Sequence, residues 1–131
     1  MSDYTIKVKD GDRLILGSES SPRALFPVGG GQQNIASYEK VSTTGATVID
    51  PAVGTTLLTT GGVHALSLAD GTYAGQQKRI YMVATGGDGT LTPANFADGS
   101  TITFDAIGDW CDLIFDGTNW NLAAYTGIAV A

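Results

Sequence analysis

Short apolar segments divided by Asp-Gly pairs restrict the fold of this 131-residue chain more than any other feature. Asp-Gly pairs occur at residues 10–11, 70–71, 88–89, 98–99 and 116–117. Because Asp and Gly tolerate the positive φ of tight turns, each pair predicts a turn between two strands. Apolar residues at helical spacing do not persist over three turns in any window. The sequence therefore predicts an all-β protein with very little helix.

Alternation of apolar and polar residues locates the strands. It is clearest from Tyr4 to Lys9, from Thr101 to Asp105 and from Asn119 to Ala124. We also expect strands over residues 13–16, 46–49, 56–59, 63–68, 78–84 and 110–115. Turn signals spaced by ~8–12 residues favour an antiparallel β-sandwich or barrel, jelly-roll-like in form. The residues from 98 to 125 predict an antiparallel meander.

The N-terminal third lacks this regular pattern. A polar loop leads into a short apolar run that contains Leu25, Phe26 and Pro27, and three glycines follow. The stretch is too polar for a compact loop and too apolar for a linker, so either an extended arm inserts into a neighbouring surface or a loop folds back on its own domain. We expect an N-terminal hairpin and flexible arm over residues 1–40 and a sandwich or barrel domain over residues 41–131.

The charge of the chain disfavours several classes of partner. The net charge is −6, and the whole excess lies after Lys40. No basic residue follows Arg79, whereas six aspartates do. Because phosphate binding needs the opposite sign, we expect no nucleic-acid partner and no anionic membrane. No apolar run reaches the ~18 residues of a spanning helix, and the N-terminus lacks the pattern of a signal peptide.

Two of the expected strands, 78–84 and 110–115, are largely apolar on both faces. In the second of them, the face opposite the expected core carries Trp110, Asp112 and Ile114. A strand that is apolar on both sides is either central in a sandwich or covered by a partner subunit. The sequence leaves both interpretations open and predicts self-association.

Residues that could support catalysis or metal binding are few. One histidine and one cysteine exclude disulfides within the chain and metal sites built from several such residues. His64 lies on an apolar strand face, and Cys111 shares a face with other apolar residues, so both are expected to pack or form hydrogen bonds. No Gly-x-Ser-x-Gly sequence marks an activated serine. We expect no enzyme, no cofactor and no metal; a turn-bound Ca²⁺ at residues 10–12 or at Asp88 stays open.

A polar turn beside an aromatic residue is the best candidate for a small-ligand site. Trp110, Asp116, Asn119 and Trp120 together offer aromatic faces for stacking a sugar and polar groups for its hydroxyls. Trp120, however, shares its strand face with Leu122, which favours core packing. Glycan binding therefore stays the alternative hypothesis.

Several motifs carry a resemblance to a known group of proteins, including Gly-Ser-Thr-Ile-Thr-Phe at residues 99–104 and Leu-Ile-Phe-Asp at residues 113–116. Residues 67–76 read Ser-Leu-Ala-Asp-Gly-Thr-Tyr-Ala-Gly-Gln, residues 92–96 read Thr-Pro-Ala-Asn-Phe, and residues 117–122 read Gly-Thr-Asn-Trp-Asn-Leu. Over roughly residues 55 to 125 the chain resembles a β module of tailed-bacteriophage virion proteins. This group includes capsid decoration (cement) proteins and modules of tail fibres and spikes. The resemblance implies a trimer without catalytic activity.

The chain is short and has neither an internal repeat nor heptads, which favours decoration over a fibre. We therefore expect a homotrimer on the capsid surface of the virion that binds the major capsid protein and stabilises the shell. The contact candidates are Leu25, Phe26, Pro27, Trp110, Asp112 and Ile114. The alternative is a tail-fibre or spike module that recognises a host receptor or glycan.

Overall fold

The computed structural model describes residues 37–131 of the chain. This part consists of strands and turns without a helix, which confirms the expected all-β class. The strands are β1 (Tyr38–Thr43), β2 (Thr47–Ile49), β3 (Thr55–Thr60), β4 (His64–Leu68), β5 (Gln76–Thr85), β6 (Gly89–Pro93), β7 (Ile102–Phe104), β8 (Trp110–Phe115), β9 (Trp120–Thr126) and β10 (Ala129–Val130). The expected N-terminal hairpin and arm, with Leu25, Phe26 and Pro27, lie outside the described residues.

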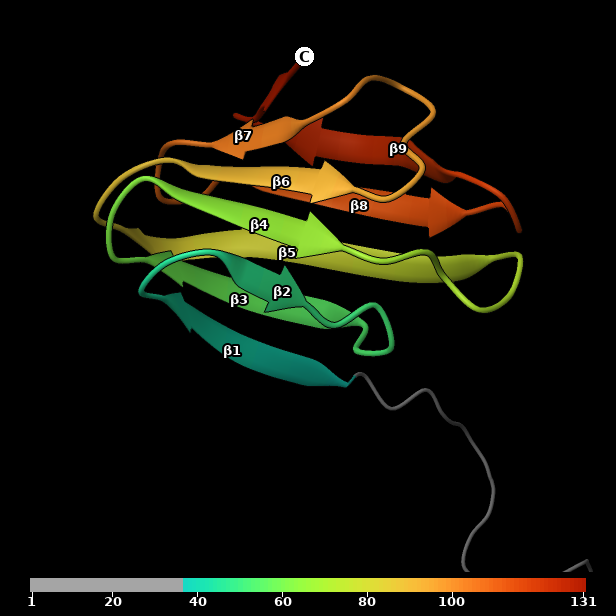
Figure 1. Ribbon diagram of the computed structural model, residues 1–131, viewed down its shortest axis with the longest axis horizontal. Coiled ribbons are helices and arrows are strands. Elements are labelled where there is room, and N and C mark those ends of the chain that lie inside the picture. Colours follow the sequence, from blue (N-terminus) through green and yellow to red (C-terminus); the bar gives the residue numbers. More distant parts are fainter. Residues whose placement is uncertain (1–36) are drawn as a thin grey trace, which may run out of the picture. The chain divides into compact units, whose positions relative to one another are not determined.

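The strands form two five-stranded sheets that pack face to face (Figure 1). Sheet A has the strand order β1-β3-β5-β8-β9, and sheet B has the order β10-β7-β6-β4-β2. In Figure 1 the strands of sheet B lie in front of those of sheet A. Apolar side chains from both layers form one core between them, so the expected sandwich is confirmed.

The first six strands form three rungs, each made of one strand of sheet A followed by one strand of sheet B. The rungs are β1 with β2, β3 with β4, and β5 with β6, and successive rungs pair in parallel in both sheets. Parallel strands need a crossover connection, which the strand in the opposite sheet supplies here. The rungs are therefore an internal structural repeat, and the expectation that the chain has no repeat is wrong.

Each rung passes from sheet A to sheet B at a corner that begins with a threonine. The corners are Thr43-Thr44-Gly45, Thr60-Gly61-Gly62 and Thr85-Gly86-Gly87. The Thr43 hydroxyl accepts a hydrogen bond from the Gly61 N–H at 3.2 Å, and an equivalent bond of 3.3 Å joins the next two corners. A Cβ on Gly87 would lie 2.6 Å from the backbone carbon of Gly62. At Gly61, Gly86 and Gly87 successive corners thus pack so closely that only glycine fits.

The remaining strands pair antiparallel, and one short turn accounts for the best-defined hairpin. β7 pairs with β6, β8 with β5, β9 with β8, and β10 with β7. Between β8 and β9, Asp116 accepts hydrogen bonds from the Thr118 and Asn119 N–H groups at 2.8 and 2.7 Å, and Gly117 has a φ of 101°. The expected meander is therefore confirmed for β8 and β9 and wrong for β7, which lies in the opposite sheet.

The expected antiparallel, jelly-roll-like strand order is wrong for the rungs, where neighbouring strands run parallel. The physical reason is that the signal for a tight turn indicates only the pairing of strands adjacent in the chain. In the rungs the chain crosses to the other sheet before it returns to pair with the earlier strand. β1, β6 and β10 were not expected as strands. Residues 38–40, expected in the N-terminal segment, belong to β1.

The core lies between the inner faces of the two sheets. In β8 the inner face carries Cys111, Leu113 and Phe115, as the alternation predicted, and all three are buried. Trp120 is fully buried next to Phe115, with ring centroids 5.2 Å apart. One face of each sheet is thus used by the core, which leaves the two outer faces for contacts with other molecules.

Candidate functional site

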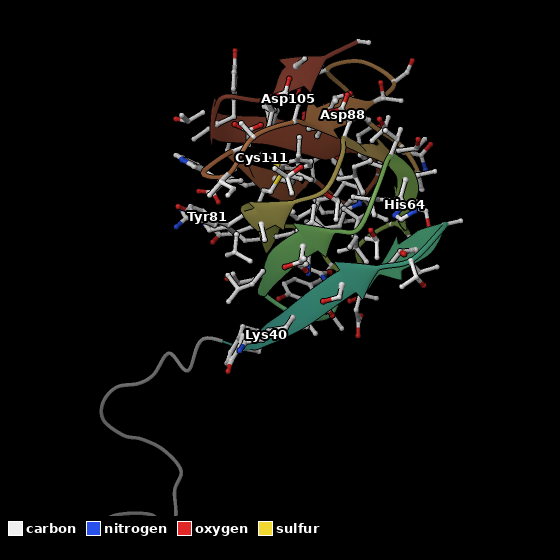
Figure 2. All side chains as sticks on the ribbon, turned by 90° about the vertical axis from the view of Figure 1, so that its left-hand side faces the viewer. Lys40, His64, Tyr81, Asp88, Asp105 and Cys111 are labelled. Carbon is white, nitrogen blue, oxygen red and sulfur yellow. The ribbon has the colours of Figure 1, made fainter. Side chains whose placement is uncertain are left out.

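The outer face of sheet A carries a row of side chains that crosses all five strands. The row consists of Lys40, Leu57, Tyr81, Trp110 and Thr126. Figure 2 shows Tyr81 on the outer side of its sheet, whereas Cys111 lies between the two layers. Because the three central members of the row are apolar or aromatic and the two end members are polar, this row has an apolar centre and polar ends at the rim of the sheet.

Val83 extends the apolar centre along β5, and Ile114 lies on the same face toward the other end of β8, where it pairs with Gln77 and Asn121. Tyr81 is 38% exposed and Val83 is 40% exposed, and the other three side chains are half-buried. We call Leu57, Tyr81, Val83, Trp110 and Ile114 the apolar patch. Adjacent large apolar residues that stay partly exposed on a sheet face are typical of an interaction surface.

An ion pair divides the apolar patch, because Arg79 and Asp112 lie between Ile114 and the other four residues. Nε and Nη2 of Arg79 donate hydrogen bonds to the two carboxylate oxygens of Asp112 at 2.6 and 2.7 Å. The Arg79 guanidinium also lies over the Trp110 ring, 5.0 Å from its centroid. The hydrogen bond to Asp112 raises the pKa of Arg79 above its ordinary value, so the arginine stays charged. The structure thus brings the expected contact residues Trp110, Asp112 and Ile114 together on one surface.

The other carboxylates of the described residues lie elsewhere. Six are in the loops between strands: Asp50, Asp70, Asp88, Asp98, Asp105 and Asp116. Glu39 accepts a hydrogen bond from the Thr56 hydroxyl at 3.0 Å, and the buried Asp109 accepts one from the Ala106 N–H at 2.9 Å. On the outer face of sheet A, the only negative charge among the described residues is that of Asp112, which Arg79 neutralises.

The outer face of sheet B has a different character. Its side chains are small or carry hydroxyl groups, with no aromatic ring and no charge among the paired residues of its strands. They are Val48, Ala65, Ser67, Thr90, Thr92, Thr103 and Ala129. Because such residues seldom dominate the binding energy of an interface, sheet A carries the stronger candidate surface.

The residues expected for glycan binding are not all brought together, because Asp116 and Asn119 share the turn between β8 and β9 whereas Trp110 lies away from it. Trp110 begins β8 and Asp116 follows its end, so about 20 Å of extended strand separates them. Trp120 is fully buried, and its Nε1 donates to the Ala69 carbonyl oxygen at 2.9 Å, so its ring is not available for stacking on a ligand. Hydrogen bonds from Asn119 and then from Asn121 lower the pKa of Asp116, whose carboxylate holds the turn.

Three of the motifs that carry the resemblance meet at one end of the sandwich. The Asn95 amide donates to both carboxylate oxygens of Asp70 at 3.0 and 2.9 Å, and the Trp120 N–H donates to the Asn95 carbonyl at 2.6 Å. Phe96 forms an isolated bridge with Trp120. The motifs therefore serve to attach the rungs to the C-terminal strands around the buried Trp120.

His64 and Cys111 occupy packed positions. His64 Nδ1 lies 2.6 Å from the Thr43 hydroxyl, at the corner between the first two rungs. Cys111 is fully buried, and burial raises the pKa of its thiol to about 12, so the thiolate is scarce at neutral pH. Among residues 37–131, no cluster of three or more histidine, cysteine or carboxylate side chains could hold a metal ion.

Arg79 and Tyr81 belong to the candidate surface but were not singled out from the sequence. The sequence shows that both residues lie on the same face of β5. The alignment of Arg79 with Asp112 and of Tyr81 with Trp110 depends instead on the register of β5 and β8. Lys78, the neighbour of Arg79, is buried instead. Its Nζ donates to the carbonyl oxygens of Asp50 and Val53, both at 2.8 Å, and desolvation lowers its pKa.

No helix among residues 37–131 could cross a membrane. Models of known protein families gave no match to the sequence, and a search of curated proteins found none that is significantly similar. The outer face of sheet A is thus the feature of the described residues from which a function can be argued.

Proposed function

We propose that this chain is a structural protein of a tailed-bacteriophage virion, namely a homotrimeric decoration (cement) protein on the capsid surface. It binds the major capsid protein and stabilises the shell, and it catalyses no reaction. The observation that supports this proposal is the apolar patch on the outer face of sheet A, because a protein that works by association needs an exposed surface to bury.

The size of the patch favours assembly through several contacts at once. Burying one large apolar side chain completely contributes about 1.5–3 kcal/mol, and the five side chains of the patch are already partly covered. The loss of free motion on association opposes this gain by about 4–15 kcal/mol. A single contact is therefore weak, whereas a closed trimer attached to a shell at several points combines many such contacts.

Binding of this kind stabilises a shell by mass action, because a protein that binds the intact shell and not its separated subunits shifts the equilibrium toward the intact form. The net charge of −6 keeps decorated particles apart in solution, and six of the carboxylates that contribute to it lie in the loops between strands. The ion pair of Arg79 and Asp112 lies on the surface that is to be covered, where unpaired charge would oppose association.

The direct test uses purified phage heads that lack this chain. We expect the protein to sediment with the heads at saturating stoichiometry and to raise the temperature at which they release their DNA. A Phe26→Ser variant, which alters the expected capsid contact, should bind the heads less tightly. Absence of binding to heads at micromolar concentration would refute the proposal.

One structural observation favours the second candidate, a module of a tail fibre or spike. The three rungs stack in parallel along one direction, which is the way elongated repeat proteins are built. A glycan array decides between the two candidates. Binding to a defined sugar, together with no binding to heads, would identify a receptor-binding module.

A further inference from the structure

We propose that a second copy of this chain, rather than the capsid protein, covers the outer face of sheet A. The inference names the partner of the surface on which the proposed function rests. Three observations bear on it: the distribution of charge, the ion pair of Arg79 and Asp112 within one chain, and the size of the face.

The first observation is the distribution of charge. Two identical chains of charge −6 repel each other wherever carboxylates face carboxylates. On the outer face of sheet A, Asp112 is the single carboxylate among the described residues, and Arg79 pairs with it at 2.6 Å. Lys40 lies in the rim of the same face. Two copies can therefore approach through this face without opposing negative charges.

The second observation is that the ion pair needs nothing from a partner. Both carboxylate oxygens of Asp112 accept hydrogen bonds from Arg79, whose guanidinium also lies over Trp110. Burial beneath an apolar neighbour thus leaves neither charge unpaired. The equivalent patches of the other copies supply such neighbours where three faces meet around the threefold axis of a trimer, and Tyr81 and Trp110 offer flat rings to the adjacent copies there.

The third observation is the size of the face. Five strands at ~4.8 Å spacing and six residues at ~3.3 Å rise give a face of about 20 Å by about 20 Å. Its projected area is on the order of 400 Å², and protruding side chains raise the accessible area above that value, against ~800 Å² per partner in specific interfaces. The whole face, including Lys40 and Thr126 at its rim, therefore takes part in the contact.

The experiment measures the mass of the full chain in solution from 1 to 100 µM by light scattering and sedimentation velocity. We expect the wild type to assemble to a multiple of the 13.5 kDa chain mass. Tyr81→Glu should raise the concentration needed for assembly at least 100-fold. The matched control is Thr92→Glu, which places the same charge at an exposed position on the outer face of sheet B and should assemble like the wild type.

A second set of variants examines the ion pair without adding charge to the patch. Asp112→Leu should weaken assembly about 10-fold or more because it leaves Arg79 unpaired in the interface. The double variant Arg79→Met with Asp112→Leu should restore assembly. Circular dichroism and thermal unfolding report whether each variant is folded. If Tyr81→Glu fails to fold, the Asp112→Leu variant and the double variant still test the inference.

Several results would overturn the inference: a wild type that is monomeric at 100 µM, a folded Tyr81→Glu variant that assembles like the wild type, or disruption by Thr92→Glu alone. The head-binding assay separates this inference from the proposed function. A monomer that still decorates heads refutes the inference and the trimer, and supports decoration of the capsid as the function. Assembly that Tyr81→Glu abolishes, in a protein that does not bind heads, supports the inference and refutes the function.

Discussion

The rungs and the strands that follow them share one core but are held together in different ways. In the rungs, β1 to β6, parallel strands stack through backbone contacts at corners such as Gly61 and Gly87, where a side chain does not fit. In β8 and β9, a four-residue turn led by Asp116 joins antiparallel neighbours. Interactions between distant residues define the rungs, and local interactions define the hairpin.

The two regions meet at Trp120, which contacts both of them within the one core. Its ring packs on Phe115 of the hairpin, while its Nε1 and its backbone N–H donate to carbonyl oxygens of Ala69 and Asn95 in the loops after β4 and β6. These loops belong to the rung region. We therefore expect the rungs and the C-terminal strands to unfold as one cooperative unit.

Replacing Trp120 should have the largest effect on this unit. Trp120→Ala removes a fully buried ring and its hydrogen bond to Ala69, and should lower the free energy of unfolding by about 3–5 kcal/mol. The matched control is Trp110→Ala, since that ring lies half-exposed on the outer face of sheet A and should cost much less. Urea denaturation followed by circular dichroism measures both. Equal losses in the two variants would contradict the assigned role of Trp120.

A corner glycine should have the next largest effect. Gly87→Ala forces a Cβ to within 2.6 Å of the Gly62 backbone, so we expect a loss of about 1–3 kcal/mol. Gly45→Ala is the matched control, because Gly45 holds the equivalent place in the first corner and a Cβ there meets nothing within 4 Å. That control should change the stability by less than about 0.5 kcal/mol. A penalty at Gly45 as large as that at Gly87 would mean that close packing between rungs is not the cause.

The difference between the two regions also explains which parts of the fold were predictable. The alternation of Cys111, Leu113 and Phe115 with their neighbours placed β8 correctly, and Asp116-Gly117 correctly marked the turn to β9. Both signals lie within a few residues. The pairing of Tyr38 with Thr55 and of Thr55 with Arg79 depends on the stacking of rungs across two layers, and the signal for it, a Thr and Gly corner that recurs at unequal intervals, was missed.

The candidate surface was predictable to the same extent. The alternation of side chains along β8 placed Trp110, Asp112 and Ile114 on the face opposite the core, and the structure agrees. Which residues accompany them is a question of register, so Arg79 and Tyr81 could not be assigned from their own strand alone. The alternative glycan site failed for a related reason: nearness in sequence suggested a cluster, whereas β8 separates Trp110 from Asp116 and the core contains Trp120.

A smaller effect is expected at Lys78, where the third rung contacts the turn between the first two. Lys78→Met removes a buried charge but also leaves the Asp50 and Val53 carbonyl oxygens without their donor, so the net change at pH 7 should be about 1 kcal/mol or less.

The informative readout for Lys78 is the pH dependence of stability. Burial lowers its pKa below the ordinary value of 10.5 despite the opposing charges of Glu39 and Asp50, so the unfolded chain binds more protons between the two pKa values. The wild type should gain stability as the pH rises through that range, relative to the Met variant. Urea denaturation at a series of alkaline pH values measures the difference, and parallel pH profiles for the two proteins would contradict it.

The smallest effect is expected in the hairpin turn, at Asp116. Hydrogen bonds from Asn119 and Asn121 lower its pKa below the ordinary value of 3.8, so the folded state favours the ionised carboxylate. The stability that this provides is complete above pH 3.8 and is lost as the pH falls through the lowered pKa. Asp116→Asn retains an oxygen that accepts from the turn N–H groups but carries no charge, so the variant should melt at a slightly lower temperature than the wild type at pH 7. Below pH 3.8 the difference in melting temperature between wild type and variant should shift in favour of the variant. A difference independent of pH from 2 to 7 would show that the local turn, unlike the stacked corners, gains nothing from its charge.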